Sequence, residues 1–122
     1  IELNAIKNVS FLPQACLETP DNKSFFESLT THKKHFDALL AKANANKARL
    51  KYVAQLENGI AKVGLQEIPE GHDFYNLEGS DNIILFYTNR YVNQPLIIKG
   101  AGAGAEVTAS GIFADIIRIG KR

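Results

Sequence analysis

The first half of the chain contains one long stretch with helical periodicity. Between residues 23 and 47, apolar residues recur every three or four positions, which is typical of an amphipathic helix. Asp21 or Asn22 is placed to cap its start, because short polar side chains accept hydrogen bonds from the first free backbone amides. Polar residues interrupt the apolar series after Leu29, so we expect a break into two helices near Thr30.

Extended patterns lie on either side of this helical stretch. Ile6 to Leu12 reads as a short strand ended by Pro13. After the helices, alternation with a period of two predicts strands at about 49–56 and 61–66. Asn58-Gly59 separates them, and this pair favours a two-residue hairpin turn. The buried face of the hairpin is expected to carry Leu50, Tyr52, Ala54, Leu56, Ala61, Val63 and Leu65.

The last third of the chain is more continuously apolar. Two runs, Ile83 to Tyr87 and Leu96 to Ile98, do not alternate, so we expect strands whose two faces are both covered. A helix from about Ala105 to Gly120 has apolar residues on most of its sides and therefore needs partners on most of its sides. The predicted fold class is α+β: an N-terminal strand and helices, an antiparallel or mixed sheet of about four strands, and a C-terminal helix after a glycine-rich turn.

Composition and charge exclude several classes of protein. With 45% hydrophobic and 22% charged residues, the chain is globular rather than disordered. A net charge of +1 argues against a dedicated nucleic-acid binder, and no apolar run approaches the roughly 20 residues of a membrane helix. Its single cysteine, Cys16, is expected to be a buried, inert thiol in the reducing cytoplasm. Because the chain opens with Ile1 and contains no methionine, we expect it to be a piece of a longer protein.

The clearest candidate for chemistry is a glycine-rich turn at Gly100-Ala101-Gly102-Ala103-Gly104, between the last predicted strand and the last helix. Glycines allow backbone amides to approach a ligand, and a helix N-terminus favours negative charge. The spacing Gly-x-Gly-x-Gly differs from the dinucleotide fingerprint Gly-x-Gly-x-x-Gly, and no Gly-Lys-Ser/Thr follows as in a P-loop. From the residues alone, both a tight structural turn and a ligand-contacting loop remain open.

The histidines are weaker candidates. His32 and His35 are three positions apart and could share a helix face, which is the minimum for two metal ligands. No carboxylate or cysteine stands at a matching spacing, so a solvated helix face is the simpler interpretation and no metal site is predicted. His72 lies in a turn-rich connector, where hydrogen bonding within the turn is expected.

Several segments of the second half resemble a known enzyme family. They are Gly79-Ser80-Asp81-Asn82-Ile83-Ile84, Tyr87-Thr88-Asn89-Arg90-Tyr91, Gln94-Pro95-Leu96-Ile97-Ile98, and Gly100 through Ala109 followed by Gly111-Ile112-Phe113-Ala114-Asp115-Ile116-Ile117. Together they resemble the C-terminal part of homoserine dehydrogenases, most closely the form fused to an aspartate kinase. The resemblance is strong over 79–117 and looser over 1–78, where Gly71-His72-Asp73-Phe74 departs from the family's His-Pro-Phe.

This resemblance implies an oxidoreductase that interconverts aspartate 4-semialdehyde and homoserine with NADP or NAD, in threonine and methionine biosynthesis. It implies that Gly104, with Gly102 and Ala103 beside it, contacts the nicotinamide end of the cofactor. Residues 1–47 would finish the catalytic region, 48–99 would form a dimerisation sheet, and 100–122 would return to the nucleotide-binding domain. The implied assembly is a cytoplasmic homodimer.

The family's nucleotide-binding Rossmann segment, and the signature that binds substrate, have no counterpart among these 122 residues. No residue of the chain is therefore predicted to be catalytic, and the chain alone is expected to be inactive. A second hypothesis is a non-catalytic assembly or dimerisation module in which the glycine turn is only structural.

Overall fold

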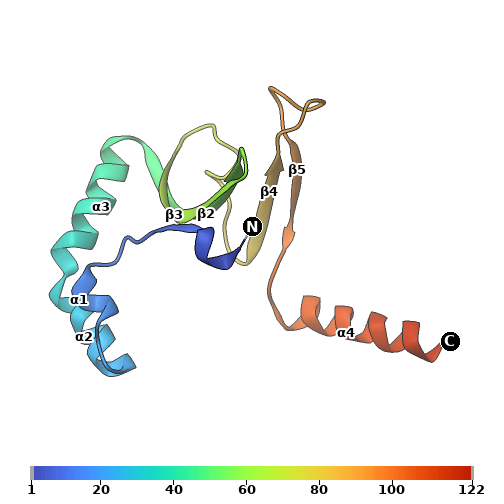
Figure 1. Ribbon diagram of the computed structural model, residues 1–122, viewed down its shortest axis with the longest axis horizontal. Helices are drawn as coiled ribbons and strands as arrows, with labels where there is room; N and C mark the ends of the chain where they lie inside the picture. Colours follow the sequence, from blue (N-terminus) through green and yellow to red (C-terminus); the bar gives the residue numbers. More distant parts are fainter. Residues whose placement is uncertain (1, 122) are drawn as a thin grey trace. The chain divides into compact units, whose positions relative to one another are not determined.

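A computed structural model describes residues 2–121 of the protein, and the fold is α+β as the sequence predicts. The chain forms two compact units, Ile1–Tyr75 and Asn76–Arg122. Within the described residues, the first unit contains three α-helices and a three-stranded sheet, and the second contains a two-stranded sheet and the last helix (Figure 1). In chain order the elements are η1 (Leu3–Ala5), β1 (Lys7–Val9), α1 (Gln14–Leu17), α2 (Asn22–Thr31), α3 (Lys33–Ala45), β2 (Ala48–Glu57), β3 (Ile60–Pro69), β4 (Asp81–Phe86), β5 (Leu96–Ala101) and α4 (Ala105–Gly120).

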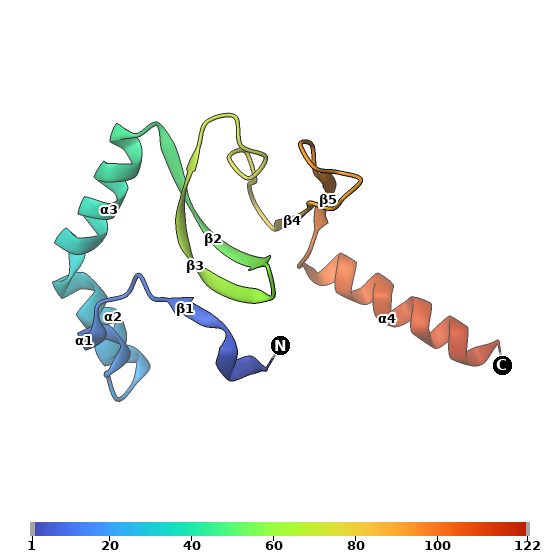
Figure 2. The ribbon, with the colours of Figure 1, turned by 45° about the horizontal axis from the view of Figure 1, so that its top comes forward.

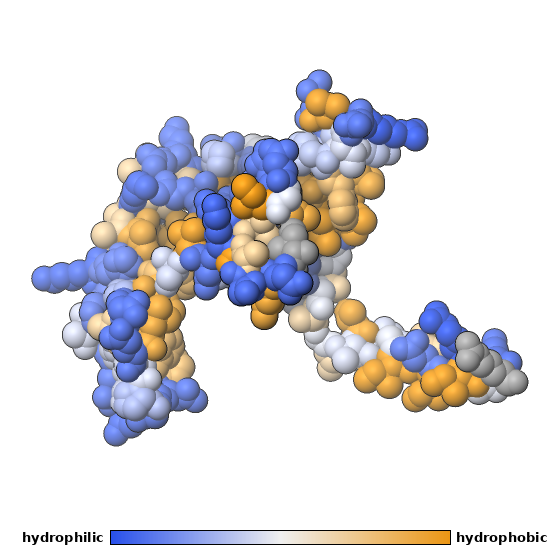
Figure 3. Space-filling model, viewed as in Figure 1, coloured by the Kyte–Doolittle hydropathy of each residue, from blue (hydrophilic) through white to orange (hydrophobic). Residues whose placement is uncertain are grey.

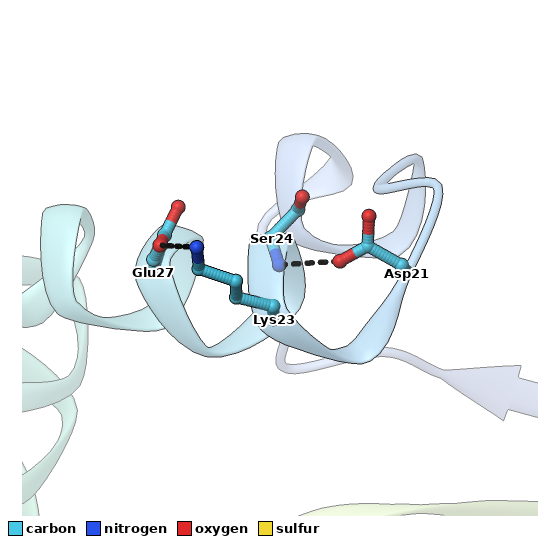
Figure 4. Close-up of polar contacts among 4 residues, drawn as sticks. All are labelled: Asp21, Lys23, Ser24 and Glu27. Atoms are coloured by element: carbon cyan, nitrogen blue, oxygen red, sulfur yellow. Dashed lines mark hydrogen bonds and ion pairs between the residues drawn. The ribbon is translucent and has the colours of Figure 1, made fainter.

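The predicted start and break of the helical stretch are both confirmed. The Asp21 carboxylate accepts a hydrogen bond of 2.8 Å from the backbone amide of Ser24, so Asp21 is the N-cap of α2 (Figure 4). One turn along, Lys23 and Glu27 form an exposed ion pair at 4.0 Å. The helix ends at Thr31, and His32 separates it from α3. A four-residue helix before it, α1, was not predicted.

The hairpin is also confirmed, and its two strands are longer than the alternating pattern predicts. Asn58 and Gly59 have φ values of 49° and 76°, the left-handed conformation that a two-residue hairpin turn requires. Strands β2 and β3 pair antiparallel over ten residues each, and β1 joins β3 in parallel. The predicted N-terminal strand shortens to Lys7–Val9 because only these residues pair with β3.

The buried face of the hairpin was predicted wrongly, since none of the seven residues expected on it is fully buried. Val53, which the alternation placed among the polar residues, is buried, whereas Tyr52 and Leu56 are exposed. Val9, Gly64 and Val53 stand in one row across the three strands, and the Val9 side chain fills the space above Gly64. The core of this unit consists of small and β-branched side chains with one thiol: Cys16, Ala43, Ala48, Val53 and Ile68.

In the second unit, β4 and β5 form an antiparallel pair (Figure 2). The strands that were expected in one sheet therefore divide between two sheets. The expectation that both faces of these strands are covered is not met within the described residues, since all six residues of β5 are exposed. One face of the pair carries a patch of four exposed apolar residues, which we call the apolar face: Ile84, Phe86, Leu96 and Ile98.

Helix α4 keeps its predicted bounds and is exposed along its whole length. Hydrophobic side chains gather along it, as the orange surface of the helix in Figure 3 shows. The exposed apolar residues are Val107, Ile112, Phe113, Ile116, Ile117 and Ile119. On the same helix, Asp115 and Arg118 form an ion pair at 3.6 Å. Within residues 2–121, no helix combines the length and apolar character needed to cross a membrane.

Candidate functional site

The glycine turn connects the end of β5 with the start of α4, as the sequence predicts. Strand β5 ends at Ala101 and α4 begins at Ala105, so Gly102, Ala103 and Gly104 form the connection. Gly104 has φ 131° and ψ 155°, a conformation that is essentially restricted to glycine. A Cβ added at Gly104 would meet no atom within 4 Å, so open space lies beside this residue. Backbone conformation, rather than crowding within the chain, therefore requires glycine at this position.

Free backbone donors follow the turn directly. The first hydrogen bond of α4 runs from the Thr108 amide to the Gly104 carbonyl, at 3.1 Å. The three preceding amides, at residues 105–107, consequently have no partner within the helix and can donate to a ligand. The N-terminus of a helix also carries partial positive charge, while Glu106 places a carboxylate in the first turn. Polar acceptor atoms of a cofactor fit this arrangement better than a bulky apolar group.

Ser80, which directly precedes β4, and Asn82, within β4, contact the turn from the opposite strand. The Gly102 amide donates a hydrogen bond of 3.2 Å to the Ser80 carbonyl. The Asn82 carboxamide lies where a Cβ on Gly102 would stand. Beside them, Lys99 and Asp81 form an ion pair at 3.5 Å across the strands. Ser80 and Asn82 were not predicted to act on this turn, because their contacts arise from the register of β4 against β5, which sequence spacing does not reveal.

Three of the other candidates are explained by local structure. His32 is half-buried rather than solvated: its Nδ1 lies 2.8 Å from the Ser28 carbonyl and 3.7 Å from Cys16 Sγ. His35 is exposed, and its Nε2 lies 2.8 Å from the Phe11 carbonyl. His72 Nδ1 accepts a hydrogen bond of 3.0 Å from the Phe74 amide, which confirms the expected bonding within the turn. Across residues 2–121, no cluster of three or more His, Cys, Asp or Glu side chains could hold a metal ion.

Cys16 is buried, as predicted, and it joins α1 to the helices that follow. Its side chain is 1% exposed and accepts a hydrogen bond of 3.3 Å from the Ser28 hydroxyl. Together with the contact to His32, this explains why a polarizable thiol stands where α1 meets the end of α2.

Comparison with known proteins tests the resemblance. The sequence profile of the family described as homoserine dehydrogenase matches residues 3–117. The chain belongs to the homoserine dehydrogenase family. The matched segment contains β5, the glycine turn and α4 as far as Ile117.

Individual relatives agree with the profile. The bifunctional aspartokinase/homoserine dehydrogenase 2, chloroplastic, of Zea mays is 39% identical over 98% of the chain, which corresponds to 13% of that protein. The homoserine dehydrogenase of Paracoccidioides brasiliensis is 38% identical over 93% of the chain and 31% of its own length. A crystal structure of a Candida auris protein of unknown function superposes with a TM-score of 0.80 at 39% identity, covering 98% of the chain and 34% of that structure.

The chain therefore spans only about an eighth to a third of the proteins that it matches. Fused and unfused enzymes match at nearly equal identity, so the sequence similarity supports the family more than either form.

Proposed function

We propose that this chain is the C-terminal part of a homoserine dehydrogenase, in which its glycine turn forms one wall of the NADP or NAD site. The observation that carries the proposal is the β5–turn–α4 arrangement, with Gly104 in a glycine-only conformation, within a segment that belongs to the family. The reaction assigned to the complete protein is the interconversion of aspartate 4-semialdehyde and homoserine, a step of threonine and methionine biosynthesis.

The turn fits a nicotinamide cofactor by its shape and by its donors. When bound, NAD(P) supplies or accepts the hydride. Gly102, Ala103 and Gly104 bring the backbone close to the nicotinamide end, where a side chain at 104 would occupy the open space beside the turn. The amides at the start of α4 donate to polar atoms of the cofactor. We assign no catalytic residue to this chain, whose part is to bind and orient.

The apolar face of the β4–β5 pair supports self-association. Ile84 and Ile98 stand directly opposite each other, with Phe86 and Leu96 as the next pair on the same face. All four are more than two-fifths exposed, and contiguous exposed apolar residues of this kind mark interaction surfaces. The proposed occupant is the same face of a second copy of the chain, which places the dimerisation sheet within residues 48–99. In the same proposal, residues 1–47 complete the catalytic region, and residues 100–122 return to the nucleotide-binding domain.

The compartment and the domain context follow from weaker features. A single, buried cysteine suits the reducing cytoplasm, which we propose as the location. We also propose an aspartate kinase domain in the same protein, because the motifs of residues 79–117 resemble the fused form most closely.

The test is homoserine-dependent reduction of NADP, and separately of NAD, by the complete protein, with this 122-residue chain as the control. We expect activity in the complete protein and none in the chain, because the chain contributes one wall of the cofactor site and no catalytic residue. A folded complete protein that is inactive with both cofactors would contradict the proposal and leave the assembly module as the better hypothesis.

A further inference from the structure

The most informative unexplained contact is the one between Asn82 and Gly102. A Cβ built on Gly102 would overlap the Asn82 carboxamide and lie 3.2 Å from the Asn82 Cβ. In the β4–β5 ladder, Asn82 stands opposite Gly100, and Gly102 is the next residue on that same face. The Asn82 side chain therefore leans diagonally away from Gly100 and covers the backbone of Gly102.

This contact explains why residue 102 is glycine. Gly102 is not among the residues with positive φ, so its backbone conformation would accept an ordinary side chain. The space beside it would not, because Asn82 fills that space. Gly104 shows the opposite situation, with free space and a glycine-only backbone. Glycine is therefore required at these two positions of the proposed cofactor wall for different physical reasons.

The turn is consequently held at both of its ends. On one side, Gly102 is bonded to the Ser80 carbonyl and covered by Asn82. On the other side, the Gly104 carbonyl accepts the first hydrogen bond of α4. Only Ala103 lies between the two fixed points. A binding loop that is ordered before the ligand arrives loses less conformational entropy on binding.

We propose that Asn82 is a positioning residue for the cofactor: its carboxamide holds Gly102, and through it the Ala103–Gly104 backbone, in the conformation that binds the nicotinamide end. This inference rests on the proposed function of the turn. Asn82 acts through Gly102 and needs no contact with the cofactor. It also lies two positions before Ile84, so the same strand carries both the positioning residue and the apolar face.

A double-mutant cycle in the complete protein tests the contact. Gly102→Ala introduces the overlapping Cβ, and we expect the KM for NADP to rise roughly tenfold while the KM for homoserine stays within about twofold. Asn82→Ala removes the side chain that covers the turn, and a smaller rise of about threefold to fivefold is expected. In the double variant the new Cβ takes the vacated space, so its KM for NADP should be no higher than that of Gly102→Ala alone. Gly100→Ala is the matched comparison, since a Cβ there meets nothing within 4 Å, and it should have a smaller effect than Gly102→Ala.

The cycle can contradict the inference directly. If the effects of the two single changes multiply in the double variant, or if the KM values for NADP and homoserine rise together, Asn82 does not position the turn. The inference is supported if the two changes have non-multiplicative effects on the KM for NADP and leave the KM for homoserine unchanged.

Amide hydrogen exchange of residues 100–108 in the cofactor-free protein provides a measurement that does not depend on activity. Asn82→Ala should accelerate exchange at the Gly102 amide, which is bonded to Ser80, by about tenfold, and unchanged exchange would overturn the inference. If the wild-type protein lacks homoserine-dependent activity while exchange still accelerates, the proposed function fails and the holding contact stands.

Discussion

At the scale of single residues, the sequence motif and the backbone agree about the turn. The Gly-x-Gly-x-Gly pattern indicated a turn that only glycine could form or that a ligand approached closely. The structure shows two different reasons for glycine: Gly104 has a backbone conformation restricted to glycine, and at Gly102 the Asn82 side chain leaves no room for a Cβ. Substitutions at the two positions therefore report on different properties of the site.

Gly104→Ala should raise the KM for NADP of the complete protein roughly tenfold. The φ of 131° would be strained for alanine by about 1–3 kcal/mol, and relaxation of that strain would move the backbone of the cofactor wall. Steady-state kinetics with varied NADP provides the measurement. Gly59→Ala is the matched control, because it places the same kind of strain, at φ 76°, in the β2–β3 turn. It should lower thermal stability and leave the KM for NADP unchanged, and an equal rise in both variants would argue against a cofactor role for Gly104.

The capping carboxylate of α2 predicts a local dependence on pH. The hydrogen bond from the Ser24 amide lowers the pKa of Asp21 below its usual 3.8. A lowered pKa means that the cap stabilises the folded helix fully at pH values well above 3.8, and that this contribution is lost as the pH falls below 3.8 through the folded-state pKa. Amide exchange over residues 22–31 should therefore accelerate at low pH beyond the intrinsic change. Asp21→Asn retains the cap without titrating, and it should remove this additional acceleration.

At the scale of elements, the three-stranded sheet depends on one glycine. Strand β1 pairs with β3 over only three residues, and Val9 lies directly against Gly64. A Cβ on Gly64 would stand 2.8 Å from the Val9 carbonyl oxygen and 2.9 Å from its Cβ, closer than real Cβ contacts. Since the Val9 carbonyl belongs to the backbone, the strand itself must move to relieve the overlap.

Gly64→Ala should separate β1 from β3 and destabilise this unit by about 1–3 kcal/mol. Native-state hydrogen exchange over residues 7–9 and 62–64 measures the loss, and we expect faster exchange in both segments. Gly111→Ala in α4 is the control, since its Cβ meets nothing within 4 Å and alanine favours a helix by about 0.5–1 kcal/mol. Equal protection of β1 in Gly64→Ala and wild type would show that the close approach to Val9 does not determine the pairing.

At the scale of the whole molecule, apolar surface is the dominant feature. The described residues bury few large side chains, while α4 and the apolar face of β4–β5 leave theirs exposed. Because each of these surfaces belongs to a segment shared with much longer relatives, we interpret them as contact surfaces of the complete enzyme.

Ile98→Asp should weaken the proposed dimer of the complete protein by at least roughly 30-fold, equivalent to about 2 kcal/mol, because a carboxylate on the apolar face would be buried without a partner. Sedimentation velocity over a range of concentrations measures the effect. Leu40→Asp in α3 is the matched control, since Leu40 is 54% exposed and Ile98 is 55% exposed. An unchanged dimer in Ile98→Asp, or equal weakening in both variants, would exclude the apolar face as the interface.

The sequence by itself determined the elements that depend on local chemistry. A helix cap at Asp21 or Asn22, a break near Thr30, the Asn58-Gly59 turn and the bounds of α4 all follow from backbone preferences and periodicity over a few residues. The residues of the glycine turn were likewise found from their pattern, and the family from its motifs.

Only the tertiary structure decided which residues meet across strands. Val53 stands in one row with Gly64 and Val9, and the close approach of Val9 to Gly64 arises from the parallel pairing of β1. The cover over Gly102 depends on the register that brings Asn82 opposite Gly100. These contacts join residues about 20 to 55 positions apart, as the registers show, and periodicity within one segment contains no information about its neighbour. For the same physical reason, the sequence shows that β4, β5 and α4 are apolar, but it does not show which surface covers them.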